Sequence, residues 1–185
     1  MRLHAVIMSW ISSIMAWRRR SYLEGLVNRG LRLGRNVEII DTFFFDPSHC
    51  FLISIGDDCT ICPNVRLIAH DASTKKHLGY TKIGMIDIGE KCFLGDSVIV
   101  LPGVKIGSHS IIGAGAVVTH DIPEGSVAAG NPARVIMTTR EYLEKVASIS
   151  GQKTIFNEDY YIEKLDDRKR KEIIHSIGDS KGFIV

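Results

Sequence analysis

The sequence has few cysteines, few prolines and no excess of charge, and each shortage excludes a class of protein. Its 185 residues include 4 cysteines and 5 prolines, so neither a disulfide framework nor a proline-rich linker is indicated. The formal net charge is +2, from 23 basic and 21 acidic residues, and gives no general argument for a nucleic-acid partner. With 45% hydrophobic residues, the chain can form one domain with a buried core.

A long apolar run is also lacking. Residues 1 to 17 are largely apolar and end at three arginines, but about 20 apolar residues are needed to span a bilayer. The charges of a secretory signal would come before the apolar run, with a small-residue cleavage site after it, and neither is clear. We expect residues 1–32 to form a helical segment that packs on its own protein, with peripheral membrane contact as the alternative. The expected location is the cytoplasm, at the inner face of the membrane under that alternative.

Much of the chain follows a repeat of six residues. From Ile88 it reads IGEKCF, LGDSVI, VLPGVK, IGSHSI, IGAGAV and VTHDIP. A period of six matches neither the 3.6 of a helix nor the alternation of a strand. Six residues at about 3.3 Å each make a straight side of roughly 20 Å, and three sides close a triangular coil. Stacked coils bury the repeated aliphatic side chain, at about 1.5–3 kcal/mol each. The pattern predicts a parallel β-helix solenoid over residues 33–136.

An insertion interrupts the repeat, and a helical extension follows it. Ile55 and Ile88 open equivalent hexads but lie 33 positions apart, which is not a multiple of six. We therefore expect residues 72–85 to form a loop that protrudes from the solenoid. Residues 137–185 read as a helical extension, with Thr138 or Thr139 as the N-cap. The two helical ends are expected to cover the open ends of the solenoid.

The cysteines have a plain structural explanation, and a metal site is not indicated. Cys59 and Cys92 hold the fifth position of their hexads and Cys62 the second, where small residues are expected. The two cysteines of the run CTIC at 59–62 are therefore interpreted as small packing residues and not as a metal or redox pair. A zinc site of the γ-carbonic anhydrase type, also built on a β-helix, needs three converging imidazoles. His70 and His77 lie seven apart and no third histidine has a matching spacing, so no metal is expected.

Between residues 86 and 136 the chain resembles the hexapeptide-repeat acyltransferases. The ending GAGAVVTHDIPEGSVAAGNPARVI is the most specific part, and the resemblance covers roughly residues 33–136. It matches the branch that contains galactoside, maltose, serine and xenobiotic acetyltransferases and many polysaccharide O-acetyltransferases. The resemblance implies an all-β solenoid, a left-handed parallel β-helix, assembled as a homotrimer with acetyl-CoA bound in a groove between subunits.

The resemblance also implies a catalytic histidine at the start of the protruding loop. His70 follows CPNVRLIA at that point and would take the acceptor's proton, then return it to the thiolate of coenzyme A. His77, inside the loop, is the alternative base. Asp71 either orients His70 or the sugar or is an ordinary loop aspartate. Relatives often place an asparagine in an early coil, where IIDTFFFDPSHCF offers Asp41, Thr42 and Asp46 instead. The substrate-binding candidates are Asp41, Asp71, His77 and Tyr80.

The donor site is likewise inferred from the resemblance. Phe93 stands where many relatives carry tryptophan, with Gly95 and Asp96 beside the thiol end. Ala114 would contact the pantetheine arm, although packing in the solenoid explains Phe93 and Ala114 equally well. The nucleotide would lie near three further residues, of which the second is a lysine in many relatives: Thr119, His120 and Arg134.

These observations predict an acetyl-CoA-dependent O-acetyltransferase that acts on a sugar hydroxyl by direct transfer, in surface-polysaccharide biosynthesis. Two alternatives stay open. One is the same chemistry on another small acceptor, such as an antibiotic, an amino sugar or serine. The other is a β-helix that serves as a non-catalytic binding module. Neither a metal nor a nucleic acid is expected as a partner.

Overall fold

The computed structural model describes residues 2–150, 154–178 and 181–184. Met1 and the remaining residues of the predicted C-terminal extension lie outside the described residues. The chain divides into two compact units, Met1–Thr139 and Arg140–Val185, and each is described by itself.

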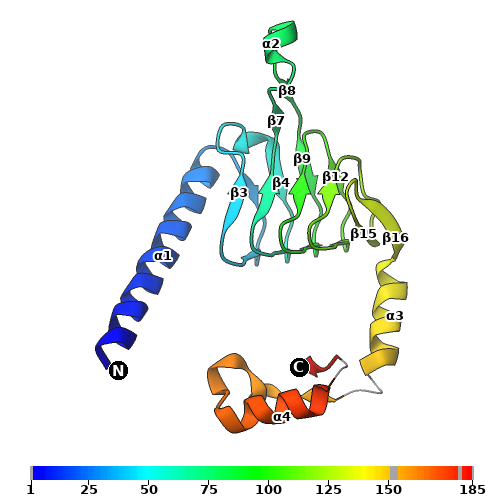
Figure 1. Cartoon of the computed structure of the whole chain (residues 1–185). Helices are drawn as coiled ribbons and strands as arrows, with labels where there is room; N and C mark the ends of the chain where they lie inside the picture. Colours follow the sequence, from blue (N-terminus) through cyan, green and yellow to red (C-terminus); the bar gives the residue numbers. More distant parts are fainter. Residues whose placement is uncertain (1, 151–153, 179–180, 185) are drawn as a thin grey trace. The chain divides into compact units, whose positions relative to one another are not determined.

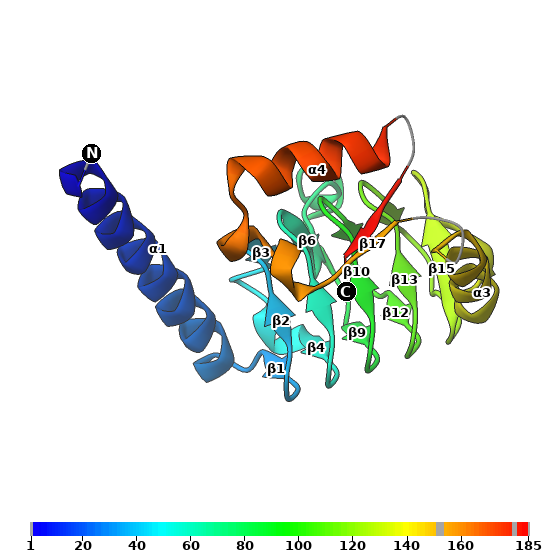
Figure 2. The same ribbon diagram turned by 90° about the horizontal axis from the view of Figure 1, so that it is seen from below.

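The first unit contains the predicted parallel β-helix, built from three sheets (Figures 1 and 2). Sheet A contains β1 (Arg32–Leu33), β4 (Ile53–Ile55), β9 (Ile86–Ile88) and β12 (Lys105–Ile106). Sheet B contains β2 (Glu38–Ile39), β5 (Thr60–Ile61), β10 (Phe93–Leu94), β13 (Ile111–Ile112), β15 (Ser126–Ala129) and β16 (Arg134–Thr138). Sheet C contains β3 (Phe43–Phe45), β6 (Val65–Leu67), β11 (Ile99–Val100) and β14 (Val117–Val118). All neighbours in these sheets are parallel except β15 and β16, which form an antiparallel pair at the end of the solenoid.

The aliphatic residue of each hexad stacks on its equivalent in the next coil. Leu94 pairs in register with Ile61 on one side and Ile112 on the other, and all three are completely buried. The coils approach so closely at the second position that a Cβ atom added to Gly89 would lie 2.5 Å from the backbone nitrogen of Ser108. The period of six therefore follows from one buried aliphatic and one small residue on each side of the triangle.

Helix α1 (Arg2–Asn28) closes the N-terminal end of the solenoid with its last turns. Leu26 is fully buried in the core, and the Cys50 thiol donates to the Leu26 carbonyl at 3.6 Å. Farther toward the N-terminus the helix presents large apolar side chains to solvent, with Trp10 70% and Trp17 68% exposed. The expected packing of the N-terminal segment on its own protein thus holds for the end of the helix. Among the described residues, no helix has the length and apolarity needed to cross a membrane.

The second unit is a small helical extension that starts within α3 (Thr139–Ser150). It continues through β17 (Ile155–Phe156), the 3₁₀ turns η2 (Glu158–Tyr160) and η3 (Ile162–Lys164), α4 (Asp167–Ile177) and β18 (Phe183–Ile184). β17 and β18 pair in parallel. Asp166 caps α4 by accepting from the Lys169 N–H at 2.8 Å. That this extension covers the far end of the solenoid stays a prediction.

Two breaks in the repeat occur where sheet C turns into sheet A, which we call the C–A corner. After β3, the 3₁₀ turn η1 (Cys50–Leu52) precedes β4. After β6, the chain leaves the solenoid through β7 (His70–Asp71), forms α2 (Lys75–Leu78) at the tip and returns through β8 (Lys82–Ile83) (Figure 1). The protruding loop therefore has its own two-stranded antiparallel stem.

Candidate active site

The two breaks at the C–A corner bring an aspartate and a histidine together. Phe45 of β3 pairs with Leu67 of β6, and the Asp46 N–H donates to the Leu67 carbonyl at 2.9 Å. Asp46 is thus the first residue past β3, and His70 begins the stem only three residues past β6. Because both breaks leave the solenoid in adjacent coils, the two side chains meet although they are 24 positions apart.

Asp46 is completely buried, and its carboxylate is surrounded by donors. One oxygen accepts from the N–H groups of Ser48 at 3.1 Å and His49 at 3.3 Å, and the other accepts from the N–H of Ala69 at 3.1 Å. Burial raises the pKa of Asp46, but the hydrogen bonds from His70 and from these backbone groups outweigh it and hold the pKa below its usual range. The carboxylate is therefore a fixed negative charge at the corner.

His70 contacts this carboxylate through its Nδ1 atom. Since Nδ1 faces an acceptor, it carries the proton of a neutral ring, and Nε2 is left with the lone pair. The side chain is 34% exposed, so a substrate can reach it. The Gly84 N–H donates to the Ala69 carbonyl at 3.0 Å and ties the returning strand of the loop beside the histidine. An imidazole held by a buried carboxylate is the arrangement of an oriented general base.

His49 completes the group of polar side chains at this corner. Its ring centroid is 4.9 Å from that of His70, and its Nδ1 atom lies 3.8 Å from the Asp46 carboxylate. The role of Asp46 beside His70 and the presence of His49 in this group were not predicted from the sequence. The available signal was the run DPSH, because an aspartate followed by proline and serine commonly accepts from the backbone two and three residues on.

These three side chains could also offer a nitrogen or oxygen atom each to a metal ion, because the ligand atoms lie within 4.8 Å of one another. Tetrahedral zinc at about 2.0–2.1 Å from its ligands separates them by roughly 3.3 Å. The contact between His70 and Asp46 is much closer than that. The absence of a metal stays a prediction, and the direct contact between His70 and Asp46 is the arrangement of a pair that can share a proton.

The loop candidates lie apart from this group. Asp71 pairs with Lys82 across the stem at 2.6 Å and accepts from the Ser73 N–H at 2.9 Å, and these partners hold the pKa of Asp71 well below its usual range. Asp46, not Asp71, orients the ring of His70. His77 is in α2 at the tip of the loop, and Tyr80 follows that helix and is 65% exposed (Figure 1).

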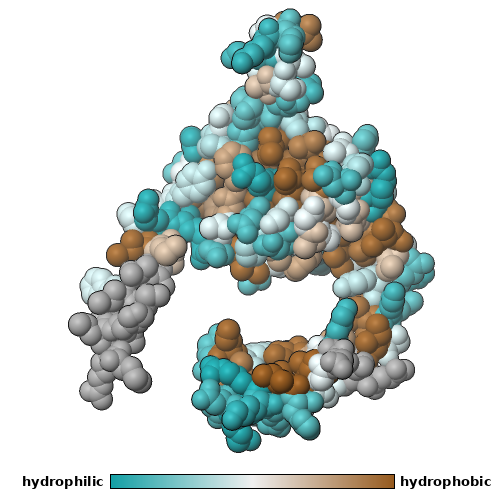
Figure 3. Space-filling model, viewed as in Figure 1, coloured by the Kyte–Doolittle hydropathy of each residue, from teal (hydrophilic) through white to brown (hydrophobic). Residues whose placement is uncertain are grey.

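Exposed apolar side chains lie near the foot of the loop. Ile83 is 59% and Met85 is 56% exposed, and the space-filling view shows hydrophobic surface where the loop joins the solenoid (Figure 3). Ile83 of β8 pairs with His70 across the stem, and Met85 comes two residues later in the chain. It can bind the apolar part of a substrate or of a second copy of the chain.

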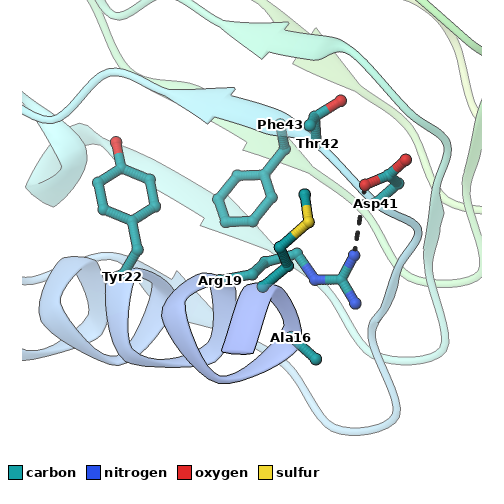
Figure 4. Close-up of a pocket in the computed structure, with 7 residues that line it drawn as sticks. Ala16, Arg19, Tyr22, Asp41, Thr42 and Phe43 are labelled. Carbon is teal, nitrogen blue, oxygen red and sulfur yellow. Dashed lines mark ion pairs between the residues drawn. The ribbon is translucent and has the colours of Figure 1, made fainter. Parts of the chain in front are cut away.

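Asp41 lies in a separate pocket between α1 and the first coil (Figure 4). The pocket has a volume of about 580 Å³, and Arg19 of α1 pairs with Asp41 at 3.7 Å. The rings of Tyr22 and Phe43 form its apolar side, with centroids 5.8 Å apart. Asp46 lies five positions after Asp41 along mostly extended chain, roughly 16 Å at about 3.3 Å per position, so Asp41 does not belong to the His70 group.

The donor candidates fall into separate places in a single chain. Gly95 packs on Ala114 of the next coil, since an added Cβ would lie 2.7 Å from the Ala114 nitrogen, and Asp96 accepts from the neighbouring Asn64 at 3.4 Å. These residues follow sheet B, and Phe93 just before them is 41% exposed. The other three lie elsewhere: Thr119 and His120 follow sheet C and contact each other at 2.8 Å, and Arg134 is exposed on β16.

Comparison with protein families agrees with this architecture. The family model described as bacterial transferase hexapeptide (six repeats) matches residues 86–120. The galactoside O-acetyltransferase of Escherichia coli (strain K12) is 37% identical over 113 residues, which is 60% of this chain and 52% of that protein. The chain spans about half the length of the curated relatives it matches.

Solved structures give the same result. A galactoside acetyltransferase in complex with coenzyme A superposes with a TM-score of 0.54 at 35% identity and covers 60% of this chain and 56% of that one. A hexapeptide-repeat acetyltransferase of Vibrio cholerae O1 biovar eltor, complexed with acetyl coenzyme A, gives 0.53 at 26% identity, over 59% of this chain and 60% of that one.

Proposed function

Because the chain belongs to the hexapeptide-repeat acetyltransferase family, we propose that it transfers the acetyl group of acetyl-CoA to a sugar hydroxyl, with His70 as the general base. The observation that carries this proposal is the contact between His70 and the buried carboxylate of Asp46 at the foot of a protruding loop. A binding module without catalysis has no need of an imidazole held in one tautomer by a buried charge.

The proposed reaction is a direct transfer. Nε2 of His70 accepts the hydroxyl proton as the acceptor oxygen attacks the thioester carbonyl, so that a C–O bond forms and the C–S bond breaks. The proton then passes from His70 to the departing thiolate. Asp46 holds the ring in the required tautomer and balances the positive charge that the imidazole carries between these two proton transfers.

The donor site is proposed to be completed by a second subunit of a homotrimer. In the single chain, Gly95 and Ala114 lie at the turn after sheet B, whereas His70 lies at the C–A corner. A groove between neighbouring subunits would bring the two edges together, with Thr119, His120 and Arg134 toward the nucleotide. Sedimentation of the active protein tests this directly, because a fully active monomer contradicts it.

The acceptor is proposed to be a sugar within a polysaccharide or its precursor. The pocket at Asp41 offers aromatic faces, a carboxylate and a guanidinium, which suit a sugar ring and its hydroxyls. Along the chain it lies roughly 16 Å from Asp46 at about 3.3 Å per residue, which is more than one sugar unit spans. A chain of sugars could occupy both places.

Helix α1 supports contact with a membrane that carries such an acceptor. Exposed Trp10 and Trp17 precede the arginines at 18–20, and no acidic residue occurs before Glu24. Sedimentation with vesicles of anionic and of neutral lipid tests this contact, and equal binding to both would contradict the role of the arginines. The cytoplasmic location stays a prediction.

The function is tested by thiol release from acetyl-CoA in the presence of a panel of acceptors. The panel contains oligosaccharides, free galactosides and maltose, an amino sugar, serine and an antibiotic that bears a hydroxyl group. We expect the highest kcat/KM with an oligosaccharide. Release with serine or the antibiotic alone would move the assignment to another acceptor, and the absence of acetyl-CoA binding by calorimetry would leave a non-catalytic module.

A further inference from the structure

His49 lies against the same carboxylate as His70 but has no hydrogen-bond partner for its ring nitrogen. Its Nδ1 atom is 3.8 Å from the Asp46 carboxylate, is buried, and makes no hydrogen bond with the described residues. The carboxylate oxygen that it faces already accepts from the Ala69 N–H and contacts His70. A carboxylate oxygen has two lone pairs, so His49 is a third polar group at an acceptor that is already filled. A buried polar atom without a partner calls for an explanation.

The two imidazole rings also pack against each other. Their planes are tilted by 35°, and the ring of Phe51 packs against His49 with the centroids 5.9 Å apart. The titratable groups that face His49 are Asp46 and His70, and Arg29, the residue after α1, reaches the same turn by donating to the Pro47 carbonyl at 3.2 Å. Two imidazoles thus lie against one buried carboxylate.

On the premise of the proposed function, we infer that His49 is a positioning residue that weakens the hold of Asp46 on the proton of His70. A neutral His49 can point its Nδ1–H at the carboxylate, and a charged His49 repels a second charge on His70. Both effects make the protonated form of His70 less favourable, so they act in the same direction. We therefore expect that removing His49 moves the acid limb of the pH profile to higher pH.

The test compares the pH dependence of kcat/KM in the wild type and three variants. His49→Phe keeps a ring against His70 and Phe51 but removes both nitrogens, whereas His49→Asn keeps a donor near the position of Nδ1. We expect the acid limb of His49→Phe to move to higher pH by about one pH unit, or about tenfold in rate on that limb, with less than about twofold change on the plateau. His49→Asn should move less. His109→Asn, at an exposed position with a φ of 60° that asparagine accepts, should not move.

Proton magnetic resonance of the imidazole Cε1–H groups, without substrates, gives a second measurement. We expect coupled titrations of His49 and His70 in the wild type and a single step for His70, at higher pH, in His49→Phe. An unmoved acid limb together with an unchanged His70 titration would overturn the inference. So would a raised KM for the acceptor with an unmoved limb, which would make His49 a substrate contact. A wild type that transfers no acetyl group counts against the proposed function alone, because the titration needs no turnover.

Discussion

The coils between Ile86 and Ala129 and the C–A corner use the same backbone for opposite purposes. In these regular coils every inward residue is apolar or small, and each strand repeats its neighbour in register. At the C–A corner of the earlier coils, a charged carboxylate is buried and two imidazoles turn their Nδ1 atoms toward it. The regular coils therefore supply a rigid framework. The candidate active site lies where two adjacent coils each interrupt the repeat at the same corner.

The largest effect should come from removing the base at this corner. His70→Ala should lower kcat/KM for acetyl transfer by about 10³-fold, within the range of about 10² to 10⁴ for general acid–base groups. Thiol release measures the rate, and calorimetry with coenzyme A should show unchanged donor binding. The control is His109→Asn, at an exposed histidine in the regular coils whose φ of 60° asparagine accepts. Near-normal turnover of His70→Ala would contradict the assignment of the base.

The solenoid could be predicted from the sequence, but the pair at its corner could not. The period of six is local information, since each hexad carries its own aliphatic residue, as Ile88 and Ile106 show. His70 was found because it stands at the break in that period. Asp46 was named only in the place of an asparagine found in relatives. Its role beside His70 was not predicted, because aspartates are usually exposed and the contact depends on how β3 aligns with β6. A resemblance transfers motifs and cannot supply this register.

A second test removes the charge and keeps the shape of the carboxylate. Asp46→Asn should lower kcat/KM by about 10²-fold, because an amide does not hold the same tautomer of His70 or balance its positive charge. It should also cost about 1–3 kcal/mol in the free energy of unfolding at neutral pH, since buried donors lose a charged acceptor. Asp87→Asn, an exposed aspartate of sheet A that accepts from Ser54, is the control and should change either quantity very little.

The same variant tests the pH dependence of stability. The pKa of Asp46 is lower in the folded protein than in the unfolded chain, so its charge stabilises the fold above the unfolded pKa of about 3.9. This contribution is lost as the pH falls through the lower, folded pKa. Denaturant unfolding between about pH 2 and pH 7 should therefore show a smaller loss of stability toward acid in Asp46→Asn than in the wild type. Parallel curves would show that folding leaves the pKa of Asp46 unchanged, and they would contradict its lowering in the folded protein.

A change in the regular coils should lower the stability of the protein and leave its activity nearly unchanged. Ile106→Ala removes a fully buried side chain that pairs in register with Ile88 and should cost about 2–5 kcal/mol in the free energy of unfolding. Activity per folded molecule should stay within about twofold, because the C–A corner is untouched. Leu78→Ala, at an exposed leucine in α2, serves as the stability control. A large loss of kcat under conditions in which the variant is fully folded would mean that packing in the regular coils also controls the active site.

The smallest effect is expected from breaking the ion pair in the stem of the loop. This test shows whether the active site extends from the C–A corner into the loop. Asp71 is adjacent to His70, but its carboxylate is turned to Lys82 and its pair is solvent-exposed. Exposed pairs contribute little, so Asp71→Asn and Lys82→Gln should each change kcat/KM by less than about threefold. Neither should move the acid limb of the pH profile, because Asp46 holds the ring of His70. If Asp71→Asn lowered kcat as strongly as Asp46→Asn, the active site would extend into the loop, and the loop would take part in catalysis rather than in closing over the acceptor.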